Sequence, residues 1–400
     1  MLEINGKYNK ALVMTDNIEE ECISQLVQLC SQEIFKDSKI RIMPDCHAGK
    51  GCVVGFTAQL KDRIIPNLIG VDISCSISTY KLNAKYIDFA ELDRVIRTYV
   101  PSGKAVRQHP SHLVNNQMKA LIYDVCREID DVESYERHIR SIGTLGGGNH
   151  FIEVDQDSEG NYWLTVHCGS RNFGKKICEF HQNLAVTNYN NKIKKDKQIA
   201  LSKIEPKDRE QWIKEHTEDK LPDELKYIEG ADLDRYTEHM NIARGFALNN
   251  HKVIVNEICT HMGWTVLDSI FTHHNYIEFL GNREMIIRKG AISAKKGERV
   301  IIPLNMKDGS IIGVGKGNDE WNQSAPHGAG RILSRSKAKS ELSLEEFKEK
   351  MKGVWTSCVS ESTLDEAPMA YKDMTTIVNA IGETVEIKEI VKPVYNFKAN

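Results

Sequence analysis

Hydrophobic residues follow two different spacings along the chain, and the alternation between them predicts the secondary structure. Short β-branched and apolar runs broken by Gly and Pro occupy 38–82 and return at 143–174, which predicts strands joined by tight turns. Apolar residues recur at helical spacing in 88–100 and 111–129. A mainly helical segment is expected from 175 to 248.

The centre of that helical segment is highly charged and is interrupted by Pro206 and Pro222. Because proline breaks helices and charge favours solvent, we interpret it as a charged helical excursion at about 185–230. Strands and turns resume over about 265–317, and a helix is expected after His327.

The C-terminal part is predicted to contain a loop over 360–373, a short helix and a last strand within 383–400. Chemistry-rich loops therefore lie towards both ends of the chain, with helices between them. This order predicts an α/β (α+β) fold, a single interwoven domain over 1–400 made of mixed β-sheets and surrounding helices. The active-site cleft is expected at strand-to-loop junctions.

Composition narrows the class of protein. The 400 residues are 40% hydrophobic and 27% charged with a net charge of −3, which is typical of a soluble globular protein. A protein that holds nucleic acid by overall charge alone is excluded, so any basic surface must be local. No signal peptide and no apolar run of the ~18–20 residues needed to span a membrane is seen. The ten cysteines form no CxxC pair, and we expect most to be reduced core residues of a cytoplasmic protein.

Asp72 and Cys75 form the first candidate site, in a turn after an apolar strand that ends at Gly70. A hard oxygen and a soft thiolate together suit a divalent transition metal better than magnesium. Taken alone, the pair is better explained as a turn aspartate and a buried free cysteine.

The stretch GGGNHFIEV places Gly146–Gly148 before Asn149 and His150. Glycines permit unusual φ values and close approach of the backbone to a ligand. On the following strand Asn149 and Glu153 share one face and His150 points the other way, so they can serve one site only where the strand begins at the rim of a cleft. The alternative is a glycine-rich turn capped by Asn149.

Two further strand-to-loop junctions carry histidines. His167 ends a strand in WLTVHCGSR, before a helix start whose amides, with Arg171, favour a phosphate; a core histidine is the alternative. His273 and His274 are adjacent and face opposite ways on an extended segment, so at most one is expected in a given metal site. Asn275 follows as an amide able to bind a ligand.

The candidate metal ligands collected at loop rims are Asp72, Cys75, His150, His167 and His274. Two metal ions sharing a bridging thiolate need about this many protein ligands, and ions ~3.5–4 Å apart commonly handle phosphoryl chemistry. Segment 288–318 adds basic charge and glycines suited to phosphates or an RNA backbone. A solvated hairpin is the alternative there, and it is stronger for Lys295 and Lys296 than for Arg288.

His327 lies between a proline and a Gly-Ala-Gly in SAPHGAGR. From these residues alone it is a packing residue, a metal ligand, a general base or a nucleophile.

The motifs GVDISC, GGGNHFIEV, HCGSR, HHN, RKGA and HGAGR occur in this order from about Pro44 onwards, and with them the sequence resembles the RtcB family of RNA ligases. The resemblance implies an RtcB-like fold and the joining of RNA 3′-phosphate or 2′,3′-cyclic phosphate ends to 5′-hydroxyl ends, in RNA repair or tRNA splicing. It implies a covalent histidine–GMP intermediate, a guanylylated RNA 3′ end, GTP and two Mn²⁺ ions as cofactors, RNA as partner and an archease-like activator protein.

The resemblance also implies the role of each site residue. Asp72 and His150 would hold one manganese ion, His167 and His274 the other, and Cys75 would bridge both. His327 would be the nucleophile that takes GMP from GTP. The implied nucleotide contacts are Asn149, Glu153 (reading the guanine edge), Asn275, Asn305, Ser310, Gly328, Ala329, Gly330 and Lys398.

The chain departs from the family pattern at several positions. Pro303–Lys307 replaces a Pro-Gly-Ser-Met-Gly segment, so Asn305 stands where the family has a nucleotide-contacting serine, and Ser74 and Ser76 stand where glycine is usual. These departures indicate a divergent subgroup with a narrower substrate or a repair role. Two alternatives stay open: a two-metal phosphoesterase or cyclic phosphodiesterase that acts on RNA ends without ligation, and a nonenzymatic RNA- or nucleotide-binding protein.

Overall fold

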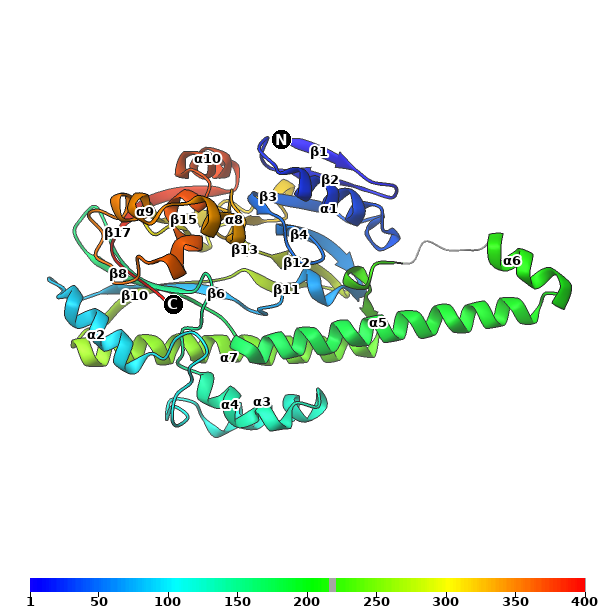
Figure 1. The fold of residues 1–400 in the computed structure, drawn as a ribbon, viewed down its shortest axis with the longest axis horizontal. Helices are drawn as coiled ribbons and strands as arrows, with labels where there is room; N and C mark the ends of the chain where they lie inside the picture. The colour runs from blue at the N-terminus through cyan, green and yellow to red at the C-terminus, as the bar shows by residue number, and fades with distance from the viewer. Residues whose placement is uncertain (216–220, 400) are drawn as a thin grey trace.

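The computed structural model describes residues 1–215 and 221–399. Two large β-sheets form the body, and two long helices lie side by side beneath them in Figure 1. This arrangement of sheets and surrounding helices confirms the predicted α/β class. Among the described residues, none of the helices combines the length and the apolar character that crossing a bilayer requires.

The six-stranded sheet contains β1 (Leu2–Asn5), β2 (Lys10–Val13), β3 (Ile40–His47), β4 (Val54–Lys61), β12 (Glu284–Lys289) and β11 (Asn275–Gly281), in that spatial order. The seven-stranded sheet contains β10 (Val266–His273), β6 (Ser76–Leu82), β8 (Tyr162–Cys168), β7 (Phe151–Gln156), β17 (Val385–Lys398), β15 (Gly309–Gly315) and β14 (Arg299–Asn305). Two small ribbons pair β5 (Arg63–Ile64) with β9 (Ile228–Glu229) and β13 (Ala291–Ser293) with β16 (Ser324–Pro326).

The helices are α1 (Glu20–Cys30), α2 (Phe89–Tyr99), α3 (Asn116–Glu128), α4 (Tyr135–Ser141), α5 (Arg171–Ser202), α6 (Arg209–Glu215), α7 (Ala231–Met262), α8 (Arg335–Glu341), α9 (Leu344–Lys350) and α10 (Met374–Ala380). Only β2 and β3 pair in parallel within the two large sheets. The remaining pairs are antiparallel, so neighbouring strand ends and their loops gather at the sheet edges.

Helix α7 ties the body together because it contributes to two hydrophobic cores. Tyr236 and Phe246 pack in the core beside the six-stranded sheet, whereas Ile254 and Ile258 pack in the core beside the seven-stranded sheet. All four side chains are fully buried. One continuous helix therefore fixes the two sheets relative to each other, and with them the loops that carry the candidate site.

The segment predicted as helical over 175–248 consists of α5 and α7, joined by the short 3₁₀ helices at Pro206–Asp208 and Asp223–Leu225 and by α6. Pro206 occupies the first position of its 3₁₀ helix, where no backbone donor is needed, and Pro222 is the N-cap residue just before the other. Figure 1 shows the far half of α5 leaving the body, with α6 at its tip.

Two local expectations differ from the structure. The helix expected after His327 begins only at Arg335, because Gly330 has a φ of +75° and an added Cβ there would lie 2.2 Å from the Asp45 carbonyl oxygen. The loop expected over 360–373 contains two short 3₁₀ helices, Glu361–Glu366 and Pro368–Ala370. The expectation that most cysteines are unpaired core residues is confirmed, since all ten are free and buried.

Candidate active site

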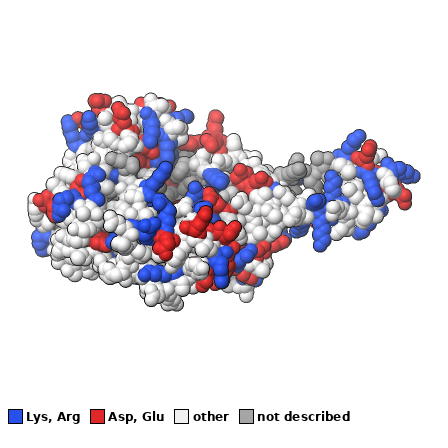
Figure 2. All heavy atoms as spheres, turned by 60° about the horizontal axis from the view of Figure 1, so that its bottom comes forward, with Lys and Arg blue, Asp and Glu red and all other residues white. Residues whose placement is uncertain are grey.

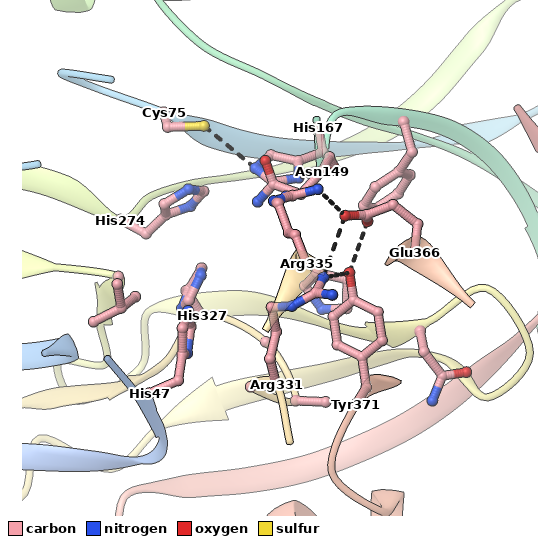
Figure 3. Close-up of a pocket in the computed structure, with 18 of the residues that line it drawn as sticks. His47, Cys75, Asn149, His167, His274, His327, Arg331, Arg335, Glu366 and Tyr371 are labelled. Atoms are coloured by element: carbon pink, nitrogen blue, oxygen red, sulfur yellow. Dashed lines mark hydrogen bonds and ion pairs between the residues drawn. The ribbon is translucent and has the colours of Figure 1, made fainter. Parts of the chain in front are cut away.

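A cavity of about 560 Å³ is lined by strands and loops of both large sheets. Thirteen of the fifteen site residues predicted from the sequence line it: Asp72, Cys75, Asn149, Glu153, His167, His274, Asn275, Asn305, His327, Gly328, Ala329, Gly330 and Lys398. Figure 3 shows the histidines on one side of this cavity and a group of charged side chains around Glu366 on the other. Of the two remaining residues, His150 contacts Cys75, and Ser310 is buried in β15, where no described residue forms a hydrogen bond with its hydroxyl.

Donors suited to a transition metal converge at the histidine side of the cavity. Cys75 Sγ lies 3.5 Å from His150 Nε2 and 3.3 Å from His167 Nε2, and Asp72 Oδ2 lies 3.2 Å from His150 Nε2. Cys75, His150 and His167 are all buried. A thiolate, imidazole nitrogens and a carboxylate oxygen at such separations can hold a divalent transition metal.

The backbone sets the orientation of two of these imidazoles. His150 Nδ1 lies 2.8 Å from the Leu145 carbonyl oxygen, and His167 Nδ1 lies 3.1 Å from the Asn149 carbonyl oxygen. A carbonyl only accepts, so each Nδ1 carries the hydrogen and each Nε2 presents a lone pair towards the Cys75 thiol. The Asn149 carbonyl of GGGNH therefore orients His167, and the Leu145 carbonyl just before the motif orients His150.

Electrostatics keeps these histidines in the form that binds metal. Burial and the neighbouring histidines hold the pKa values of His167 and His274 well below their ordinary range, so both are neutral at pH 7. Burial and Asp72 raise the pKa of the Cys75 thiol well above its ordinary value. A divalent cation reverses that shift by stabilising the thiolate, so the pocket's donors fit a metal ion.

His274 lies between β10 and β11, and its ring centroid is 5.2 Å from that of His167 and 4.8 Å from that of His327. Its Nδ1 is buried without a hydrogen-bond partner among the described residues, which leaves this nitrogen for a ligand. His273 turns away and accepts a hydrogen bond from Arg244 Nε at 2.9 Å. Only one residue of the pair therefore lines the cavity, in line with opposite faces of an extended segment.

His327 is held by a carboxylate that sequence analysis missed. Asp45 Oδ2, in β3, accepts hydrogen bonds from His327 Nδ1 at 2.7 Å and from the His327 backbone amide at 3.1 Å. Asp45 is fully buried, whereas His327 lines the cavity. Because the carboxylate fixes the proton on Nδ1, His327 Nε2 keeps its lone pair, and it has no hydrogen bond to a described residue. The missed signal is the carboxylate of Asp45 in the largely apolar run IRIMPDCH, since a buried carboxylate needs a partner.

Glycines bring the loop of His327 close to its neighbours. Gly290 has a φ of +64°, and a Cβ added there would lie 2.1 Å from the Val54 side chain and 3.2 Å from His327 Cε1. Ala291 pairs with Pro326 in the small ribbon β13–β16, so the residues just before His327 are fixed by backbone pairing. These close approaches explain the bare composition of HGAGR and RKGA.

The opposite side of the cavity is a buried charge network around Glu366. Lys398 Nζ and the Tyr371 hydroxyl donate to Glu366 Oε2 at 2.6 and 2.7 Å, and Arg335 donates to Oε1 at 2.6 Å. Burial opposes the ionised form, but Lys398 and Arg335 lower the pKa of Glu366 to about 2. Glu366, Tyr371 and Arg335 were not predicted, because single residues whose partners lie elsewhere in the sequence give no local pattern. Arg331 also donates to Glu366, at 3.3 Å.

Three predicted nucleotide contacts have additional structural roles. Glu153 is buried and accepts a hydrogen bond from Asn396 at 2.6 Å. Asn275 donates to the Asp72 carbonyl oxygen at 2.9 Å and accepts from the Gly290 amide at 2.9 Å, so it joins the loops of the metal-type cluster and of RKGA. Asn305 accepts from the amides of the second and third residues after it, both at 2.9 Å, which makes it a turn-forming residue.

Two basic residues considered for phosphate binding lie elsewhere. Arg288, in the segment considered for phosphates or an RNA backbone, is fully buried and donates to Glu278 at 2.6 Å, so its side chain is used inside the fold. Arg171 donates to the Gly103 carbonyl oxygen at 3.2 Å and is not among the cavity-lining residues. Arginine in a basic-looking segment is as easily used inside the fold as on its surface.

Comparison with known proteins matches the chain to one family over almost its whole length. The sequence model of the tRNA-splicing ligase RtcB matches residues 25–399. The RNA-splicing ligase RtcB1 of Escherichia coli strain ATCC 25922 is 32% identical, and the RNA-splicing ligase RtcB of strain K12 is 30% identical, each over 92% of both chains. The tRNA-splicing ligase RtcB of Methanococcus maripaludis is 25% identical over 92% of this chain and 88% of its own. A match of this extent, on a chain with these motifs in one cavity, makes the protein a member of the RtcB family.

Proposed function

We propose that this protein is an RNA ligase that joins an RNA 3′-phosphate or 2′,3′-cyclic phosphate end to a 5′-hydroxyl end. The observation that supports this most strongly is the Asp45–His327 pair, 2.7 Å apart, in the same cavity as the metal-type cluster around Cys75. A nucleophile with a fixed tautomer beside bound cations is the arrangement that phosphoryl transfer needs.

His327 Nε2 is the proposed nucleophile towards the α-phosphorus of GTP. An N–P bond forms, the bond from the α-phosphorus to the bridging oxygen breaks, and pyrophosphate leaves. Asp45 keeps the Nδ1 proton in place and balances the positive charge that develops on the imidazole. The product is His327 carrying GMP.

The residues that would hold two Mn²⁺ ions are Asp72, Cys75, His150, His167 and His274. When bound, the ions neutralise charge on the phosphate oxygens. The thiol favours manganese over magnesium, which prefers oxygen ligands only.

The remaining cavity residues are proposed to bind the guanine nucleotide. Glu153 accepts from the guanine edge, and Lys398 contacts the nucleotide from the end of β17. The other proposed contacts are Asn149, Asn275, Asn305, Ser310, Gly328, Ala329 and Gly330. The Asn305 side chain is engaged in its own turn, so it contributes through the shape of the loop.

GMP then passes from His327 to the RNA. An oxygen of the RNA 3′-phosphate attacks the phosphorus of the His327-bound GMP, the N–P bond breaks, and a phosphoanhydride forms. The 5′-hydroxyl attacks the RNA 3′-phosphorus, loses its proton to solvent, and expels GMP as the leaving group. A cyclic phosphate end needs prior opening by one water molecule. An archease-like activator stays a prediction.

The experiment is an end-joining assay. Purified protein with Mn²⁺ and GTP is given one RNA ending in 3′-phosphate and a second beginning with 5′-hydroxyl, and a joined product is expected only when both cofactors are present. Because the Asn305 side chain bonds within its own turn, one alternative function stays open, that of a cyclic phosphodiesterase. GTP-independent opening of cyclic ends with no joined product would support that alternative and defeat the ligase.

A further inference from the structure

Helix α5 continues far beyond the body of the protein. Its last buried residue is Ala185. Among the described residues, Asn188 and Asn190 form its last hydrogen bonds to the body, Asn188 as donor and Asn190 as acceptor. Residues 191–202 continue the helix, and α6 follows at the tip. We call residues 191–214 the arm (Figures 1 and 2).

The arm is basic in a chain that is acidic overall. It contains eight lysines and arginines against four aspartates and glutamates, a net charge of +4, whereas the whole chain carries −3. Four lysines, Lys192, Lys194, Lys195 and Lys197, follow one another within six positions. None of these four forms an ion pair with any residue that the structure describes. Figure 2 shows lysine and arginine side chains spread over the arm.

The close spacing of these lysines favours binding of a polyanion. Lys192 and Lys195 are three positions apart on the helix, as are Lys194 and Lys197, and like charges at that spacing repel each other. In the described part of the arm no continuous apolar stripe is offered to another helix, because Asp196 and Lys197 follow Ile193 at helical spacing, and the exposed Ile199 (46%) and Ile213 (37%) lie in different helices. Closely spaced positive charge without an apolar face fits a phosphate backbone better than a protein surface.

The geometry of α5 fixes the distance between the arm and the cavity. The helix begins at Arg171, four residues after His167. With a rise of about 1.5 Å per residue, Lys192 lies ~32 Å and Ser202 ~47 Å along the helix from Arg171. An RNA whose ends occupy the cavity can reach the arm only if its folded part extends about 30 Å or more.

We propose that the arm binds the phosphate backbone of the RNA substrate at about this distance from the ends being joined, and so favours long, structured RNA over short oligonucleotides. The proposal rests on the proposed function, because it takes the RNA ends to lie in the cavity. The arm adds affinity and substrate preference and makes no contact with the reacting atoms.

The test compares RNA binding by the full chain and by a variant in which Lys192, Lys194, Lys195 and Lys197 are all replaced by glutamine. Glutamine has nearly the same helix propensity as lysine, so the helix is kept. Binding is measured by fluorescence anisotropy, without GTP, for an RNA hairpin of about 16 base pairs and for a single strand of about six nucleotides.

The variant is expected to bind the hairpin on the order of 10-fold more weakly at ~0.1 M salt, and to lower the slope of log Kd against log salt by about 3. Binding of the short strand is expected to stay within about twofold. A matched control makes the same charge change on the body, at Lys36, Lys85, Lys252 and Lys350, all exposed, and is expected to bind both RNAs like the wild type. Replacing the four arm lysines by arginine should restore hairpin binding.

Hairpin binding unchanged in the glutamine variant would overturn the proposal and leave the arm as a protein-docking element. An equal loss for the short strand, or in the body control, would overturn it too. GMP labelling of His327 is measured on the same samples: an arm-dependent RNA affinity in a protein that takes no label would refute the ligase while retaining the arm as an RNA-binding element.

Discussion

Asp45–His327 and Asp131–His138 are two buried carboxylate–imidazole pairs, and in each 2.7 Å separates an aspartate Oδ2 from a ring nitrogen. Asp45 binds Nδ1 of a ring that lines the cavity, which leaves Nε2 free. Asp131 binds Nε2 of a ring that is 1% exposed and packs against Phe173. The same bond thus leaves Nε2 of the proposed nucleophile free in one place and completes a buried hydrogen-bond network in the other.

The cysteines beside these pairs differ in the same way. Cys75 and Cys126 each belong to a buried group of three donors within 4.8 Å of one another. The rings near Cys75 are oriented by backbone carbonyls, so their lone pairs face the thiol. Near Cys126 the donors are already used, since Asp131 also accepts from Ser134 at 2.8 Å and lies 3.4 Å from Lys176. Donor type alone therefore does not define a metal site; free lone pairs facing a cavity do.

The largest expected effect comes from replacing the aspartate of each pair by asparagine. Asp45→Asn is expected to slow GMP labelling of His327 on the order of 10³-fold, because an amide no longer holds the imidazole in the required tautomer. Asp131→Asn is expected to leave the initial labelling rate within about twofold. Equal labelling rates in the two variants would contradict the difference in role between the two aspartates.

The cysteines give the next largest effect. Cys75→Ser is expected to weaken Mn²⁺ binding at least ~100-fold and to abolish the thiolate-to-metal absorption of Co²⁺-loaded protein, because the only thiol among the proposed ligands is lost. Cys126→Ser should keep both properties. Absorption that survives in Cys75→Ser and disappears in Cys126→Ser would place the metal at the Cys126 group and contradict the site proposed at Cys75.

The structural role of the Asp131–His138 pair is tested by measuring the free energy of unfolding. Asp131→Asn is expected to lower the free energy of unfolding by about 1–3 kcal/mol, because His138 and Ser134 lose a charged partner inside the protein. Asp130→Asn is the control, since Asp130 is exposed, and a change below about 0.5 kcal/mol is expected. Urea unfolding of both variants gives the two values, and equal values would remove the structural role assigned to Asp131.

The smallest expected effect concerns a buried carboxylate without a histidine partner. Burial raises the pKa of Glu153 above its ordinary value of 4.5, against the opposing influence of hydrogen bonds and Lys398. A raised pKa means that the ionised form, which is the form proposed to read guanine, accumulates only as the pH rises. GTP is therefore expected to bind several-fold more tightly at about pH 8 than at about pH 6, where an ordinary carboxyl would already be ionised.

Replacing Glu153 by glutamine should remove this pH dependence. Calorimetric titration with GTP at both pH values measures it. Equal affinities in the wild-type protein, or an unchanged pH dependence in Glu153→Gln, would count against a guanine-reading carboxylate.

Local patterns were sufficient for much of the site and the fold class. His150, His167 and His274 were predicted because strand-to-loop junctions place side chains at sheet edges, and the structure brings them together. Asp45 and Glu366 were missed because their significance lies in partners about 280 and 32 residues away, His327 and Lys398. Long-range pairing of this kind leaves no mark on the spacing of a single segment.

The errors have the same origin. The helix expected after His327 is prevented from starting there by the contact between Gly330 and Asp45, and Arg288, in a segment considered for phosphate binding, is instead held inside the fold by Glu278. In both cases a tertiary contact overrides the local preference.

The most direct measurement is transfer of label from GTP labelled at the α-phosphate, in the presence of Mn²⁺, to the wild-type protein and to His327→Ala. An acid-labile label on the wild type and none on the variant is the expected result. No label on the wild type, or label that persists in His327→Ala, would contradict the assignment of His327 as the nucleophile.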